Sequence, residues 1–255
     1  MFIDVTRIDE IALVTLNRPQ SLNALSYAML RELAAAFDQI ENSDARALII
    51  TGAGEKAFCA GADIGELMGR TIEQEYAGTF LGQTIFSRLE RLRTPSIALV
   101  NGYALGGGCE LSLACTFRLA TPRARFGLPE IKLGLVPGYG GTQRLPRLVG
   151  LGTALDIMMS GRFVEAEEAA RIGLVNRIVA EDPLRQAITY ARQFTSFSLL
   201  ALKLIRDSAM RGIDTTLAEG LRIEADLSTV SMESADGKEG AAAFLAKRAP
   251  VFQDR

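Results

Sequence analysis

The chain contains no histidine among its 255 residues. Ser-His-Asp and Cys-His hydrolase mechanisms are therefore excluded, and so are metal sites built on histidine ligands. An active site in this chain must rely on carboxylates and on backbone dipoles. We expect no metal ion and no prosthetic group.

The sequence also lacks an excess of either positive or negative charge. The net charge is -2, from 28 basic and 30 acidic residues, and the sequence has no long block of one sign. A protein that binds nucleic acid normally carries a basic patch, so no nucleic-acid partner is expected. No apolar run reaches the roughly 18 residues that cross a bilayer, which argues against a membrane helix.

Cysteine is limited to Cys59, Cys109 and Cys115. An odd number of cysteines in a chain without a secretory leader indicates reduced thiols and a cytoplasmic protein. Cys109 and Cys115 lie among apolar residues, so we expect buried, unreactive thiols.

Apolar spacing predicts an α/β fold in the first half of the chain. Wholly apolar strands alternate there with amphipathic helices, and Ser26 is expected to cap the first helix. The expected elements are a hairpin within 2–16, a helix over 26–42, a strand at 47–52, a short helix at 64–68, a helix over 71–92 and a strand at 96–100.

The second half becomes helical. Helices are expected at 152–160 and 165–172, followed by a strand at 175–179 and by helices throughout from Pro183. No linker rich in proline, glycine or serine interrupts the chain. We place a domain boundary near Ser196, which gives a core of residues 1–195 and a helical region of residues 196–255.

The stretch 101–141 combines two glycine clusters with two carboxylates. A run of three glycines, 106–108, precedes an apolar helix, whose first N–H groups are unpaired and suit a developing anion. Glu110 falls in the first turn of that helix, and Glu130 follows twenty residues later, after a strand-like segment. The two carboxyls can meet only through tertiary folding, as acid/base pairs usually do.

Five segments resemble the enoyl-CoA hydratase/isomerase (crotonase) family, in the family's order and over nearly the whole chain. They read LNRPQSLNAL, KAFCAGADI, NGYALGGGCEL, FGLPEIKLGLVPGYGGTQRLPRLVG and SADGKEGAAAFLAKRAPVF. The resemblance implies a spiral of ββα units with a C-terminal helical region that assembles trimers, often paired into hexamers. It also implies acyl-coenzyme A thioesters as substrates.

The family's catalytic residues fall on matching positions of this sequence. The oxyanion-hole N–H groups correspond to Ala62 and Gly107, which stabilise an enolate. The two glutamates that characterise hydratases within this family are both present, as Glu110 and Glu130. The resemblance therefore implies syn addition of water to a 2-trans-enoyl-CoA. In that reaction Glu110 would act as general base and Glu130 as general acid. Such a pair should titrate together. The N–H of Gly138 is expected to help position the water.

The coenzyme A site is expected around Ala60, Ala62, Asp63 and Ile64, with Arg18 near the phosphates. Asp63 should also cap the short helix that follows it.

Two more residues of that site, Phe244 and Lys247, are expected to come from a neighbouring subunit. The sequence departs from the family at Gly65, where hydratases often carry a lysine, and at Thr116, where relatives commonly have aspartate. We expect one phosphate contact to be missing and a local structural effect at Thr116.

Several alternatives remain open at this stage. The enzyme is either a hydratase or a relative such as a double-bond isomerase, which needs a single glutamate. A non-catalytic scaffold that binds RNA is a third hypothesis, disfavoured by the nearly neutral charge and by the presence of both glutamates. Leu67, Met68 and the helix from Thr71 either line the acyl pocket or belong to the core.

Overall fold

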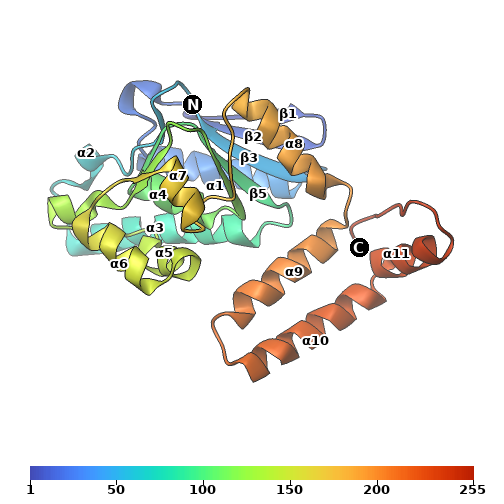
Figure 1. Cartoon of the computed structure of the whole chain (residues 1–255). Helices are drawn as coiled ribbons and strands as arrows, with labels where there is room; N and C mark the ends of the chain where they lie inside the picture. Colours follow the sequence, from blue (N-terminus) through green and yellow to red (C-terminus); the bar gives the residue numbers. More distant parts are fainter.

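The computed structural model describes all 255 residues. Figure 1 shows a body of strands and helices from which the last three helices protrude. The strands are β1 (Ile3–Ile8), β2 (Ile11–Leu16), β3 (Ala47–Gly52), β4 (Ala57–Cys59), β5 (Ser96–Val100), β6 (Tyr103–Leu105), β7 (Phe117–Ala120), β8 (Arg125–Gly127), β9 (Val164–Glu165) and β10 (Arg177–Ile178). The helices are α1 (Tyr27–Glu41), α2 (Ile64–Leu67), α3 (Ile72–Arg91), α4 (Gly107–Ala114), α5 (Gly141–Val149), α6 (Leu151–Ser160), α7 (Ala166–Arg171), α8 (Pro183–Thr195), α9 (Leu199–Gly212), α10 (Leu217–Glu233) and α11 (Ala235–Leu245), with two short 3-10 helices, η1 (Pro19–Ser21) and η2 (Pro129–Leu133).

The body is built from repeated units of two strands and a helix. The first strands of the units, β3, β5 and β7, pair in parallel within a six-stranded sheet ordered β1-β2-β3-β5-β7-β10. The second strands, β4, β6 and β8, pair in parallel within a four-stranded sheet ordered β4-β6-β8-β9. This arrangement confirms the predicted α/β spiral of ββα units.

Side-chain alternation along the six-stranded sheet produces two cores. Ile49 and Ile97 point to one face, where they pack with Ala187 and Tyr190 of α8. Their neighbours, such as Ile50, point to the other face and join the main core beneath α1, α3 and α4. Because successive residues of a strand face opposite sides, strands buried on both faces must be apolar throughout.

Side chains cap the starts of α1, α2 and α3, and the caps of α1 and α2 were predicted from the sequence. The Ser26 side chain accepts a hydrogen bond from the N–H of Met29 and so caps α1. Thr71 and Gln74 form a reciprocal capping box at the start of α3. The Asp63 side chain accepts from the N–H of Gly65 and caps α2, as expected.

Some elements differ from the predictions. The strand expected at 175–179 is reduced to the two residues of β10. The helix α5 was not predicted, because its glycine start and internal Pro146 obscure its apolar spacing. The short strands β4, β6 and β8 were likewise not predicted in full, since three residues are too few to show an alternating pattern.

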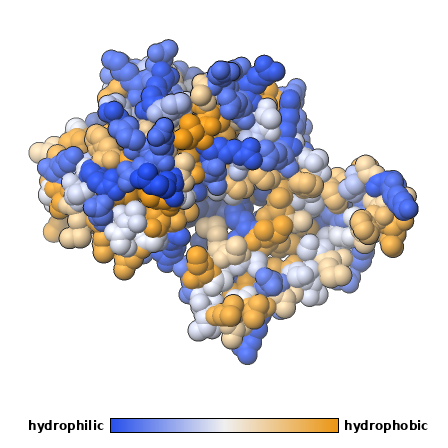
Figure 2. Space-filling view, viewed as in Figure 1, coloured by the Kyte–Doolittle hydropathy of each residue, from blue (hydrophilic) through white to orange (hydrophobic).

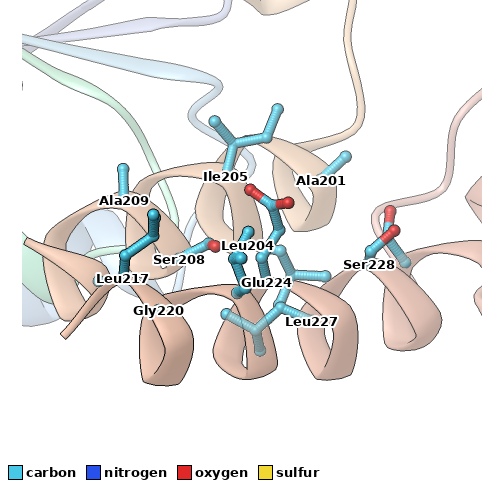
Figure 3. A pocket seen from close by; sticks show the side chains of 13 residues that line it. Ala201, Leu204, Ile205, Ser208, Ala209, Leu217, Gly220, Glu224, Leu227 and Ser228 are labelled. Carbon is cyan, nitrogen blue, oxygen red and sulfur yellow. The ribbon is translucent and has the colours of Figure 1, made fainter. Parts of the chain in front are cut away.

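The protruding helices expose apolar surface. Figure 2 shows hydrophobic side chains along this part of the chain. Its exposed apolar residues include Ile205, Leu217 and Phe244. A groove of about 510 Å³ runs between α9 and α10. Figure 3 shows it lined mainly by aliphatic and small side chains, with Glu224 as its one carboxylate. This groove lacks the paired acids that catalysis needs.

No helix is both long enough and apolar enough to cross a membrane.

Candidate active site

The predicted catalytic residues meet at one edge of the four-stranded sheet. The neighbouring parallel strands β4, β6 and β8 all end there. The loop after β4 carries Ala62, the helix after β6 carries Gly107 and Glu110, and η2 after β8 carries Glu130. All four residues line one pocket of about 370 Å³. The carboxyl ends of parallel strands are where α/β folds place their ligands.

Glu110 is fixed by the backbone of a distant loop. Its side chain is only 1% exposed. Its Oε1 atom accepts hydrogen bonds from the N–H of Tyr139 at 2.8 Å and from the N–H of Gly141 at 2.7 Å. Burial raises its pKa to about 7, assisted by the charge of Glu130 and opposed by the two N–H donors. Glu110 can therefore gain and lose a proton near neutral pH.

Glu130 has a different environment. It is half-buried, and its Oε2 atom is fully buried without a hydrogen-bond partner in the protein. Burial raises the pKa of this carboxyl as well. An unpartnered buried carboxyl oxygen is unfavourable unless the carboxyl is neutral or another group binds it. Glu130 is thus suited to hold a proton in the pocket.

Two backbone N–H groups complete the pocket. The N–H of Ala62 makes no backbone hydrogen bond. Gly107 is the first residue of α4, so its N–H has no carbonyl partner within the helix. A Cβ atom on Gly107 would lie 3.4 Å from the nitrogen of Ala62, which shows that the two N–H groups are close together. They form a candidate oxyanion hole.

The three glycines before Glu110 have separate steric roles. Gly106 has a φ of 51°, and a Cβ there would lie 2.9 Å from Oε1 of Glu130. A Cβ on Gly107 would lie 3.2 Å from the ring of Tyr139. A Cβ on Gly108 would lie 2.0 Å from the carbonyl oxygen of Cys59. The whole run is therefore needed for the close approach of α4 to the pocket and to β4.

Gly108→Ala should lower the free energy of unfolding by about 1 to 3 kcal/mol or more, because β4 and α4 must separate to admit the methyl group. Gly152→Ala is a matched control. It lies within α6 with nothing within 4 Å of its added Cβ, so it should be neutral or stabilising by a few tenths to about 1 kcal/mol. Chemical denaturation measures both, and equal effects of the two substitutions would refute the packing argument.

Glu110→Gln should change how stability depends on pH. In the wild type the raised pKa lets the folded protein keep a proton that the unfolded chain loses above pH 4.5. The free energy of unfolding therefore falls as the pH rises from 4.5 to about 7. Glutamine removes this loss, so the variant should gain stability relative to the wild type across that window, by at most about 3 kcal/mol. Thermal unfolding at a series of pH values tests this, and parallel curves would contradict it.

Of the residues predicted to bind coenzyme A, Ala60, Ala62 and Ile64 line the same pocket, whereas Arg18 and Asp63 do not. The N–H of Ala60 donates to the carbonyl of Leu22. Arg18 and Asp63 form an ion pair of 2.6 Å, and the hydrogen bond from Arg18 lowers the pKa of Asp63.

The other predicted residues divide between the pocket and the distant helices. Gly138 lines the pocket, where its carbonyl accepts a hydrogen bond from Gln83. Phe244, which is 84% exposed, lies on α11, and Lys247 follows that helix. Figure 1 places α11 at the opposite end of the molecule from α2, so the chain's own fold does not bring Phe244 and Lys247 to the pocket.

The structure also shows where the candidate pocket residues Leu67 and Met68, the unusual Thr116 and the three cysteines lie. Leu67 lines the pocket, whereas Met68 is 76% exposed and belongs to neither core nor pocket. The hydroxyl oxygen of Thr116 accepts from the N–H of Ser96, which ties β7 to β5. All three thiols are buried, as predicted for Cys109 and Cys115, and burial raises the pKa of each to about 12, which disfavours the reactive thiolate.

Sequence reasoning missed two groups of pocket residues. The first is the pair of N–H donors at Tyr139 and Gly141, for which the glycine-rich PGYGG turn before α5 was the available signal. The second is Tyr27, which joins Glu75 and Thr79 in a polar wall of the pocket. Glu75 and Thr79 belong to the helix from Thr71, so part of that helix lines the pocket, which was one of the two expected alternatives. No signal in the sequence places Tyr27 there, because it reaches this wall only when α1 packs beside α3.

Comparisons with known proteins identify the family of this chain. The family model described as enoyl-CoA hydratase/isomerase matches residues 6–255. The chain is 46% identical to a protein of Rhizobium meliloti named as a probable enoyl-CoA hydratase, over 96% of this chain and 95% of that one. It is 44% identical to a short-chain-enoyl-CoA hydratase of Clostridium acetobutylicum, over 94% of this chain and 92% of that one. A crystal structure of an enoyl-CoA hydratase from Bacillus anthracis superposes with a TM-score of 0.94 and 40% identity, and covers 100% of both chains.

Proposed function

The chain belongs to the enoyl-CoA hydratase/isomerase family, and from that premise we propose that its pocket adds water to a 2-trans-enoyl-CoA by the joint action of Glu110 and Glu130. Relatives and structural neighbours are named as enoyl-CoA hydratases, and the protein is accordingly an enoyl-CoA hydratase, a hydro-lyase. The observation that carries the catalytic assignment is the convergence of a buried carboxyl, a half-buried carboxyl and two free N–H groups in one pocket.

In the proposed mechanism, the thioester carbonyl accepts hydrogen bonds from the N–H groups of Ala62 and Gly107. The ionised Glu110 takes a proton from water as the water oxygen bonds to Cβ, and the electrons of the double bond move onto the thioester as an enolate. Glu130 then gives its proton to Cα, and the product is a 3-hydroxyacyl-CoA. One carboxyl gains a proton and the other loses one, so the total charge of the pair is unchanged.

The two N–H groups should favour the enolate over the ground-state thioester, because negative charge develops on the carbonyl oxygen only as water adds. Removing one such donor commonly costs about 3 to 4 kcal/mol of transition-state stabilisation. The N–H of Gly138 is proposed to orient the attacking water, since this N–H makes no backbone hydrogen bond and Gly138 lines the same pocket.

We propose that coenzyme A lies across the rim formed by Ala60, Ala62, Asp63 and Ile64. One nitrogen of the Arg18 guanidinium is paired with Asp63, and the rest of this planar group remains available for a phosphate. Gly65 supplies no side chain there, which supports the expected loss of one phosphate contact.

Residues 196–255 are proposed to assemble the enzyme as a homotrimer or a hexamer. The apolar surface on the protruding helices supports this assembly, because such surface is rarely left open to water. A neighbouring subunit would then bring Phe244 and Lys247 to the coenzyme A site. A cytoplasmic location is part of the same proposal and is supported by the three unpaired thiols.

Product analysis tests this proposal. The purified protein is incubated separately with crotonyl-CoA and with 3-butenoyl-CoA. A hydratase converts crotonyl-CoA to 3-hydroxybutyryl-CoA. Conversion of 3-butenoyl-CoA to crotonyl-CoA without any hydration would replace the proposal with a double-bond isomerase, and absence of both reactions would point to a non-catalytic protein.

A further inference from the structure

The pocket has one wall that the proposed chemistry does not use. The thioester, the coenzyme and the reacting carbons are assigned to the loop after β4, the start of α4 and η2. The tail of the acyl chain must therefore meet the remaining lining residues. On the side of α1 and α3 these are Tyr27, Glu75 and Thr79. This wall is polar, whereas Leu133, Leu135 and Val136 on another side are aliphatic.

An ion pair stands behind this polar wall. The Nε atom of Arg70 lies 3.0 Å from Oε1 of Glu75, and the guanidinium carbon of Arg70 lies 4.3 Å from the centre of the Tyr27 ring. Both ion-pair atoms are fully buried and make no hydrogen bond. The pair is held by charge and by stacking on the tyrosine, so a hydrocarbon chain that reached it would further desolvate two charges without offering a partner.

The same wall is attached to the start of α1. A carboxyl oxygen of Glu66 accepts a hydrogen bond from the N–H of Tyr27 at 2.6 Å. A Cβ on Gly78 would lie 2.2 Å from the Tyr27 hydroxyl, so α3 approaches that ring as closely as a glycine allows. Both α2 and α3 are thus held against the start of α1, which leaves little room for the wall to move away from the pocket.

We propose that Tyr27, Arg70 and Glu75 close the acyl pocket with a charged end and restrict the enzyme to short 2-enoyl chains. This inference rests on the proposed function and adds its substrate class. In an apolar pocket each further methylene strengthens binding by about fourfold. Against an ion pair whose two facing atoms are buried, that gain is lost, so longer chains should bind no better than short ones and should be hydrated more slowly.

The test is a series of chain lengths. We compare kcat/KM for crotonyl-, hexenoyl-, octenoyl- and decenoyl-CoA between the wild type and the double variant Arg70→Leu/Glu75→Leu. The wild type should prefer crotonyl-CoA. The double variant should raise the ratio of decenoyl to crotonyl activity by at least about tenfold, because its end wall is apolar. Glu73→Leu, on the exposed side of α3, is the matched control and should leave the ratio unchanged.

Two further measurements keep the inference falsifiable. Glu75→Gln retains the shape of the side chain and removes only its charge, so it serves if the double variant does not fold. Affinities for saturated acyl-CoAs of the same lengths do not depend on turnover, so they test the wall even if no chain is hydrated. A wild type that binds and hydrates decenoyl-CoA as well as crotonyl-CoA, or an unchanged length preference in the variants, would overturn the inference. Failure of hydration alone would overturn only the proposed function.

Discussion

Glu110→Gln should reduce kcat for crotonyl-CoA hydration by about 10² to 10⁴, the usual contribution of a positioned base. The amide cannot take a proton from water. Its oxygen can still accept the hydrogen bonds that Tyr139 and Gly141 donate to the wild-type carboxylate, so the pocket should keep its shape. The affinity for butyryl-CoA, which needs no base, should change little.

The wild-type pH profile provides a second readout of the same residue. Since burial places the pKa of Glu110 at about 7, kcat/KM should rise with pH through that value as the carboxylate forms. Glu167→Gln, an exposed carboxyl on α7, is the control and should leave rate and profile unchanged. If Glu110→Gln were to retain the wild-type rate, another group would have to be the base.

Glu130→Gln should cause a loss of similar size, about 10² to 10⁴ in kcat, because the amide cannot deliver a proton to Cα. Three carboxyl side chains line the pocket, those of Glu75, Glu110 and Glu130. The carboxyl of Glu130 is half-buried, and one of its oxygens has no hydrogen-bond partner. The carboxylate of Glu75 instead forms an ion pair with Arg70.

Hydrogen exchange separates the roles of the two glutamates. In D2O, the enzyme should exchange the Cα hydrogens of butyryl-CoA through the enolate held by Ala62 and Gly107. This exchange needs the group that faces Cα but no attacking water. It should be lost in Glu130→Gln and largely kept in Glu110→Gln. The reverse pattern would exchange the two assignments.

The sequence was sufficient to predict the elements with long periodic patterns. Ser26 and the apolar spacing after it mark α1, and the apolar segment at 47–52 marks β3. The four-stranded sheet was harder to predict, because β4, β6 and β8 have only three residues each and are too short to show an alternating pattern. Yet these are the strands whose ends position the pocket.

Some residues of the candidate site could be predicted from the sequence, and others could not. Motif resemblance indicated Glu110 and Glu130, and the structure places both in one pocket. The hydrogen bonds from Tyr139 and Gly141 arise where a loop about thirty residues away folds back on α4, as no local pattern can show. Likewise, the proposed role of the Arg70–Glu75 ion pair depends on its position beside the pocket, which only the folded chain shows. Side-chain roles can be inferred from sequence, whereas their partners depend on tertiary packing.

The most direct test of the paired-carboxylate account follows the conjugated thioester absorbance of crotonyl-CoA with the wild type, Glu110→Gln, Glu130→Gln and the Glu167→Gln control side by side. The account predicts rapid loss of absorbance with the wild type and the control, and a rate at least about 100-fold lower with either catalytic-site variant. Wild-type protein that binds crotonyl-CoA without consuming it, or glutamine variants that hydrate it at the wild-type rate, would contradict the account.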